Sequence, residues 1–109
     1  MYQPNNKDGY HDVLDKIRQK TLVYGDNTLM AEFKLEAGAI LPQHSHPHEQ
    51  TGYLVSGYIE LTIGDITHLI KPGDSWCIAG DVEHNAVAMA DSVAVEVFSP
   101  VREDYLPEV

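Results

Sequence analysis

Three histidines fall within five residues of the sequence, the densest cluster of metal-ligating side chains in the chain. His44 and His46 are two residues apart, so on an extended strand both imidazoles project from one face, as adjacent ligands of a metal ion must. Pro42 and Pro47 disfavour a helix here, because proline lacks a backbone donor and restricts the residue before it. Residues 38–57 are therefore predicted to be strand and turn, and we expect the rest of the chain to be organised around them.

Glu96 is the second residue whose type and position suggest chemistry. It interrupts the apolar run of residues 93–98, where burial of an unpaired carboxylate would be costly. The two-residue period of a strand places Ala94, Glu96 and Phe98 on one face. We expect that face to line a cavity, and the alternative is that Glu96 points outward at a sheet edge.

Short β-rich segments separated by turn residues must position these side chains. The predicted strands are 17–24, 28–35, 50–55, 58–63, 66–70, 75–79, 85–89 and 92–98. The first two form a hairpin around Gly25-Asp26-Asn27, and one helical turn is predicted near residues 12–16. This pattern predicts an all-β domain, a jelly roll or closed barrel, over residues 17–109, with residues 1–16 as an N-terminal arm.

The composition limits the partners and the compartment. The 109 residues suffice for one domain, and 17 acidic against 7 basic side chains give a formal charge of −10, which disfavours nucleic acid and anionic lipid surfaces. Cys77 is the single cysteine, so no internal disulfide is expected, and the N-terminal residues lack the pattern of a secretory leader. With no apolar run of about 20 residues, the sequence predicts a cytoplasmic protein without a membrane span.

The histidine-rich stretch has the spacing of a known motif. The positions of Gly38, His44, His46, Gln50 and Gly57 resemble the first motif of the cupins. The resemblance implies a single-domain cupin jelly-roll β-barrel with a metal ion at its centre.

The second cupin motif is degenerate in this chain. His84 stands where the last metal ligand of the family lies, but Ala79 and Asp81 replace the usual proline and glycine, and Ala88 replaces an asparagine. The resemblance implies one divalent transition metal held by His44, His46, Gln50 and His84. Zinc, nickel, iron, copper and manganese all suit imidazole and amide ligands.

Gln50 stands where cupins more often have glutamate. Glu49 is the rival oxygen ligand, but strand parity places it opposite the histidines, so we choose Gln50. His48 shares the parity of the ligands but follows Pro47 in a predicted loop. We expect it to line the mouth of the cavity, and the alternative is that it ligates the metal. His11 and His68 have no partner pattern and are expected to be surface residues.

The C-terminal residues 98–106 resemble one subgroup, the small cupins of pectin and alginate breakdown. Residues 73–76 and 46–50 resemble the same subgroup, although Val101 replaces a proline and Glu96 replaces an aspartate. Enzymes of that subgroup open 4,5-unsaturated uronates to linear 5-keto-4-deoxyuronates. The resemblance therefore implies a small anionic sugar acid as substrate.

The resemblance also implies roles for individual residues. Glu96 is the candidate for proton transfer, and Arg102 is the second catalytic candidate and the partner of the substrate carboxylate. Phe98 would pack against the sugar ring, and Gln50 and His48 complete the expected substrate contacts. Cupins commonly pair through edge strands, so a homodimer is expected.

Two other functions are compatible with the same residues. A different metallocupin enzyme, such as an oxygenase or a polyketide cyclase, could use the same ligands, because fold and ligand set do not fix the reaction. A metal-dependent binder of sugars or effectors would show saturable binding without turnover.

Overall fold

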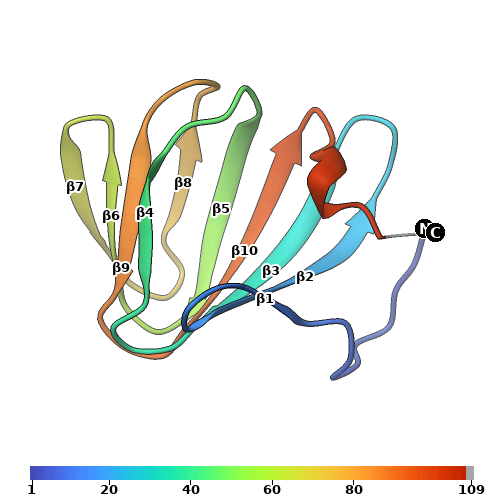
Figure 1. Cartoon of the computed structure of the whole chain (residues 1–109), viewed down its shortest axis with the longest axis horizontal. Coiled ribbons are helices and arrows are strands. Elements are labelled where there is room, and N and C mark those ends of the chain that lie inside the picture. The colour runs from blue at the N-terminus through green and yellow to red at the C-terminus, as the bar shows by residue number, and fades with distance from the viewer. Residues whose placement is uncertain (108–109) are drawn as a thin grey trace.

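The chain folds into two antiparallel sheets that face each other, as predicted for a jelly-roll barrel (Figure 1). A computed structural model describes residues 1–107. Its elements are β1 (His11–Leu14), β2 (Ile17–Tyr24), β3 (Leu29–Leu35), β4 (Ile40–His44), β5 (Glu49–Ser56), β6 (Ile59–Ile63), β7 (Ile66–Ile70), β8 (Ser75–Ile78), β9 (His84–Ala88), β10 (Ser92–Ser99) and the 3-10 helix η1 (Glu103–Tyr105). The six-stranded sheet has the order β1-β2-β3-β10-β5-β8, and the four-stranded sheet has the order β4-β9-β6-β7.

The core lies between the sheets because each strand turns alternate side chains inward. In β5 the residues Gln50, Gly52 and Leu54 are buried, and the residues between them are exposed. Leu54 packs with Ile59 and other apolar side chains from both sheets. The inward row of β5 therefore runs from apolar core at Leu54 to a polar group at Gln50.

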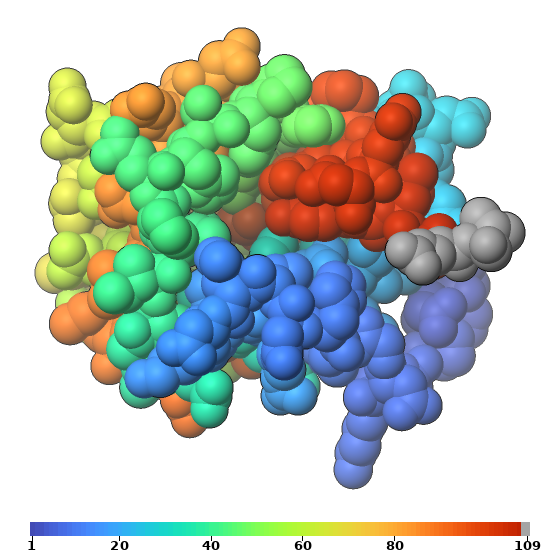
Figure 2. All heavy atoms as spheres, in the orientation of Figure 1, coloured from blue at the N-terminus to red at the C-terminus, as the bar shows by residue number. Residues whose placement is uncertain are grey.

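A second, smaller apolar cluster holds the C-terminal segment against the barrel. Phe98 is buried with two residues of β3, and Tyr105 and Leu106 pack on this cluster. The Thr21 hydroxyl of β2 donates a hydrogen bond to the Tyr105 carbonyl. In Figure 2 the C-terminal segment, in red, lies on the face of the molecule above the N-terminal residues, in blue. These contacts fix the position of the residues that follow β10.

All eight predicted strands are present, with ends that differ by at most one residue. The helical turn predicted near residues 12–16 is wrong, because β1 pairs antiparallel with β2 there and Lys16 adopts a positive φ in the connecting turn. The sequence of β1, with its exposed side chains, carries no alternation that marks a strand, so only the pairing defines it. Among residues 1–107, no helix is long and apolar enough to cross a membrane.

Candidate functional site

Three histidine rings meet at one end of the four-stranded sheet. His44 ends β4 and is paired in register with His84, which begins β9, and His46 follows in the loop after β4. The His84 ring centroid lies 4.1 Å from that of His44 and 5.1 Å from that of His46. One ring nitrogen of His44, one of His46 and one of His84 lie within 4.8 Å of one another. The structure thus brings together the three histidines that the two motifs single out.

The backbone fixes which nitrogen each ring turns inward. Each Nδ1 lies 2.8 to 3.0 Å from a backbone carbonyl, which can only accept, so each Nδ1 carries a proton, and in a neutral ring the lone pair is on Nε2. The three acceptors are the carbonyl oxygens of Pro42, His48 and Val82. Burial lowers the pKa of His46 and of His84, which favours the neutral rings that metal binding needs.

Two further observations test whether a cation fits this cluster. The Nε2 atom of His84 is buried and has no hydrogen-bond partner among the described residues. The Gln50 amide oxygen lies 2.9 Å from Nε2 of His46, so two acceptor atoms face each other. A divalent ion would give His84 Nε2 a partner and would separate the lone pairs of His46 Nε2 and the Gln50 oxygen by binding both atoms. Three imidazole nitrogens and one amide oxygen suit a transition metal. The residues therefore fit the expected ion, while Glu49 is exposed.

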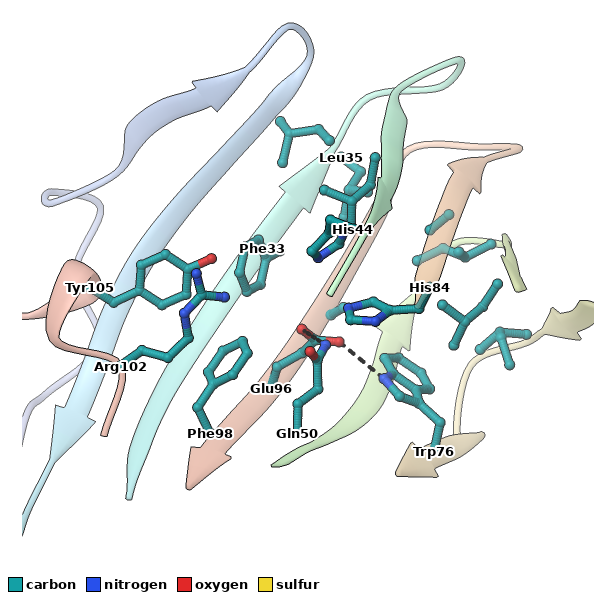
Figure 3. Close-up of a pocket in the computed structure, with 17 residues that line it drawn as sticks. Phe33, Leu35, His44, Gln50, Trp76, His84, Glu96, Phe98, Arg102 and Tyr105 are labelled. Carbon is teal, nitrogen blue, oxygen red and sulfur yellow. Dashed lines mark hydrogen bonds between the residues drawn. The ribbon is translucent and has the colours of Figure 1, made fainter. Parts of the chain in front are cut away.

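Glu96 faces the cavity beside this cluster, and not the outer surface (Figure 3). Its carboxylate accepts a hydrogen bond from Gln50 Nε2 at 2.6 Å and another from Trp76 Nε1 at 3.0 Å. Burial raises the pKa of the Glu96 carboxyl, and the two hydrogen bonds oppose that shift. A carboxyl with a raised pKa is suited to both accepting and returning a proton near neutral pH.

Arg102 extends over the same cavity from the segment after β10. Its guanidinium carbon lies 4.1 Å from the ring centroid of Tyr105 and 5.1 Å from that of Phe98. Arg102 Nε and Nη2 donate to the two carboxylate oxygens of Asp104, at 3.2 and 2.7 Å. Two aromatic rings and one carboxylate therefore hold the cation in place at the edge of the cavity (Figure 3).

The fold and these motifs agree with the comparisons to known proteins. Residues 31–100 match the family of the cupin domain. This chain belongs to the cupin family. It is 29% identical over 99 residues to the pectin degradation protein KdgF of Dickeya dadantii, covering 89% of this chain and 90% of that protein.

Solved cupin structures superpose closely on this one. KdgF from Halomonas sp. has a TM-score of 0.92 and 30% identity, with 97% of this chain and 98% of that chain covered. An RmlC-like cupin from Shewanella frigidimarina has a TM-score of 0.91 at 23% identity, covering 96% and 95% of the two chains. The predicted cupin jelly roll and the resemblance to the pectin-degradation cupins are confirmed.

Two predicted site residues of this cupin, His46 and His48, do not line the central cavity. The ring centroid of His48 lies 5.6 Å from that of His46. The carbonyl oxygen of His48 is the partner of His46 Nδ1, so His48 helps to orient the His46 ring. His11 and His68 are exposed and lie outside the cavity lining.

Three residues of this cupin site were not assigned roles from the sequence. Trp76 donates to Glu96, Tyr105 packs on the Arg102 guanidinium, and Asp104 pairs with Arg102. Trp76 is the single tryptophan of the chain, but nothing in its local pattern shows that its indole crosses to another strand. Asp104 and Tyr105 lie in a segment without periodicity, so only the fold reveals their contacts.

Proposed function

We propose that this cupin is a metal-dependent enzyme that opens 4,5-unsaturated uronates to linear 5-keto-4-deoxyuronates. The observation that carries the proposal is the Glu96 carboxylate, which accepts a hydrogen bond from Gln50 and lines the same cavity as His44, His84 and Arg102. The similarity to KdgF proteins supports the substrate class. His44, His46, His84 and Gln50 would hold one divalent ion, which would supply Lewis acidity toward substrate oxygens. We further propose that the enzyme acts in the cytoplasm as a homodimer, as the sequence leads us to expect.

Glu96 would move the protons of this reaction. Its carboxylate accepts the proton of the C1 hydroxyl as the C1–ring oxygen bond breaks, which leaves an aldehyde at C1 and an enolate at C5. The resulting carboxyl returns a proton to C4, and the enolate becomes the 5-ketone. No electrons are gained or lost overall, so the residue needs only a pKa near the working range, which its burial favours.

Arg102 would bind the substrate carboxylate with the part of its guanidinium that Asp104 leaves free. Asp104 occupies Nε and one hydrogen of Nη2, along one side of the guanidinium. The outer edge, with one N–H from each Nη atom, still offers two parallel donors. Phe98 lines the cavity with its ring under the guanidinium and is 1% exposed, so it would support Arg102 from below, and its contact with the sugar ring would be limited to the ring edge at the cavity.

The proposal is tested by mixing the protein with an unsaturated uronate and following the ultraviolet absorbance of its conjugated double bond. We expect the band to disappear with turnover. With zinc at a saturating concentration, Glu96→Gln should reduce kcat by at least about a hundredfold while changing KM little, because it keeps the shape and removes the proton acceptor. Saturable binding of the uronate without loss of the band would instead indicate a metal-dependent binder.

Gln50→Glu is expected to keep or tighten metal binding and to raise KM for the uronate. Three neutral imidazoles and an amide leave a divalent ion with its full charge, and a carboxylate would cancel one unit of it. The measurements are metal content and KM, with Glu49→Gln as the matched control on the exposed side of the strand. An unchanged KM would mean that Gln50 does not ligate the ion.

A further inference from the structure

Gly52 lies in β5 between Glu96 of β10 and Trp76 of β8, whose side chains are hydrogen-bonded to each other over the β5 backbone. It is paired in register with Glu96 of β10 on one side and with Trp76 of β8 on the other. A Cβ atom built on Gly52 would collide with the indole ring of Trp76. The indole therefore lies over the backbone of β5 in the space that a side chain would fill, and this allows its N–H to reach a strand that is not its neighbour.

Trp76 is one end of a chain of hydrogen bonds that ends at the ligand cluster. One Glu96 oxygen accepts from the indole N–H, and the other accepts from the amide nitrogen of Gln50. An ionised carboxylate can only accept, so Gln50 must turn its nitrogen toward Glu96 and its oxygen toward His46. The donors around Glu96 thus decide which atom of the Gln50 amide faces the three histidines.

We propose that Trp76 is a positioning residue that acts through Glu96 to keep the Gln50 oxygen directed at the metal ligands, with Gly52 as the gap it requires. The inference rests on the proposed function in that it takes the four-residue cluster as a metal site. A glutamate has more rotatable bonds than an aspartate, so a carboxylate held only by Gln50 has more conformations available. The indole N–H removes that freedom by holding the second oxygen.

The expected effect is a loss of metal affinity in variants that change no ligand. Residues that orient ligands typically contribute 10- to 100-fold to metal affinity or activity. We expect Trp76→Phe and Gly52→Ala each to weaken zinc binding at least about tenfold, as measured by competition with a chromophoric chelator. Gly25→Ala is the matched control, because a Cβ at Gly25 meets nothing within 4 Å.

A double-mutant cycle separates positioning from mere packing, since Trp76 also packs against the core. In a Glu96→Gln background one of the two carboxylate oxygens becomes an amide nitrogen, which cannot accept a hydrogen bond. Residue 96 can then no longer accept from both Trp76 and Gln50, so the chain of hydrogen bonds is already broken. We expect Trp76→Phe to cost less than about twofold in zinc affinity in that background, against about tenfold in the wild-type protein. Equal losses in both backgrounds, or wild-type affinity in Trp76→Phe, would overturn the inference.

Two more readouts accompany the affinity. Trp76 is the only tryptophan, so its fluorescence reports directly on this contact: Gly52→Ala should shift the emission and Gly25→Ala should not. With uronate as substrate, Trp76→Phe should lower kcat more than it raises KM, because the indole acts through Glu96 and is not a binding group. Wild-type protein that binds zinc but opens no uronate would contradict the proposed substrate and leave the positioning role standing, whereas failure to bind zinc would overturn both.

Discussion

Protein carrying both His44→Asn and His84→Asn is expected to contain no bound divalent ion and to lose at least about a thousandfold in uronate turnover. Asparagine can place a donor near the position of Nδ1, so the hydrogen bonds to the Pro42 and Val82 carbonyls can persist. What disappears is the pair of Nε2 lone pairs, one of which has no other partner among the described residues. A metal ion contributes several kcal/mol to charge stabilisation, and each 1.36 kcal/mol is a factor of ten in rate.

Metal analysis of the purified protein measures the first effect, and the thermal response to added zinc measures it independently. A ligand at 100 times its dissociation constant adds about 2.7 kcal/mol to the free energy of unfolding, or roughly 10 °C in Tm for a domain of this size. Wild-type protein should show that rise and the double variant should not. Because the comparison is made with and without zinc, any intrinsic destabilisation from changing the buried His84 cancels.

His68→Asn is the control, since His68 is exposed on β7 and lies outside the cavity lining. It should retain the metal and the activity. If the double variant retained an equimolar ion, the ligand cluster would have to be sought elsewhere in the chain.

The strands were predictable because turn residues punctuate the sequence at short intervals and apolar residues alternate between them. The hairpin of β2 and β3 is one example, where Gly25-Asp26-Asn27 separates two β-rich segments. β1 was not predicted because its side chains are exposed and it is defined by its backbone pairing with residues 17–19 of β2. A strand held mainly by backbone pairing leaves little trace in the hydrophobic pattern.

In the candidate site, too, the features that depend on one strand were predictable from the sequence and those that depend on several strands were not. Strand parity was enough to turn Glu96 inward, because that choice depends on one strand. The choice of Gln50 over Glu49 counted parity across the loop after β4, and the structure supports it through the alternation within β5, which buries Gln50 and exposes Glu49. The contacts of Trp76 depend on three strands in register and on a missing side chain at Gly52, which no local pattern encodes. His48 shares the parity of His44 and His46, but the loop after β4 does not keep the two-residue period, and the rings of both His46 and His48 lie outside the cavity lining.

Arg102→Ala is expected to leave folding and metal content intact and to lower kcat/KM for unsaturated uronates at least tenfold. Charge-assisted hydrogen bonds contribute about 1.5 to 3 kcal/mol each, so loss of one or two of them to the substrate carboxylate predicts this magnitude or more. Part of the effect could arise indirectly, since the guanidinium also packs on Phe98 and Tyr105 and pairs with Asp104. Asp104→Asn, which keeps a side-chain acceptor beside Arg102, is therefore the matched variant and should change kcat/KM far less.

Arg102→Lys distinguishes a general need for positive charge from recognition by two parallel donors. Lysine restores the charge but presents a single ammonium group, which cannot match both carboxylate oxygens in the way the outer edge of the guanidinium can. Its stem also cannot stack on the rings of Phe98 and Tyr105 as a planar cation does. We therefore expect Arg102→Lys to recover only part of the activity lost in Arg102→Ala, with KM remaining high. Full activity in Arg102→Ala would show that Arg102 does not bind the uronate, and the group that binds the substrate carboxylate would have to be sought elsewhere around the cavity.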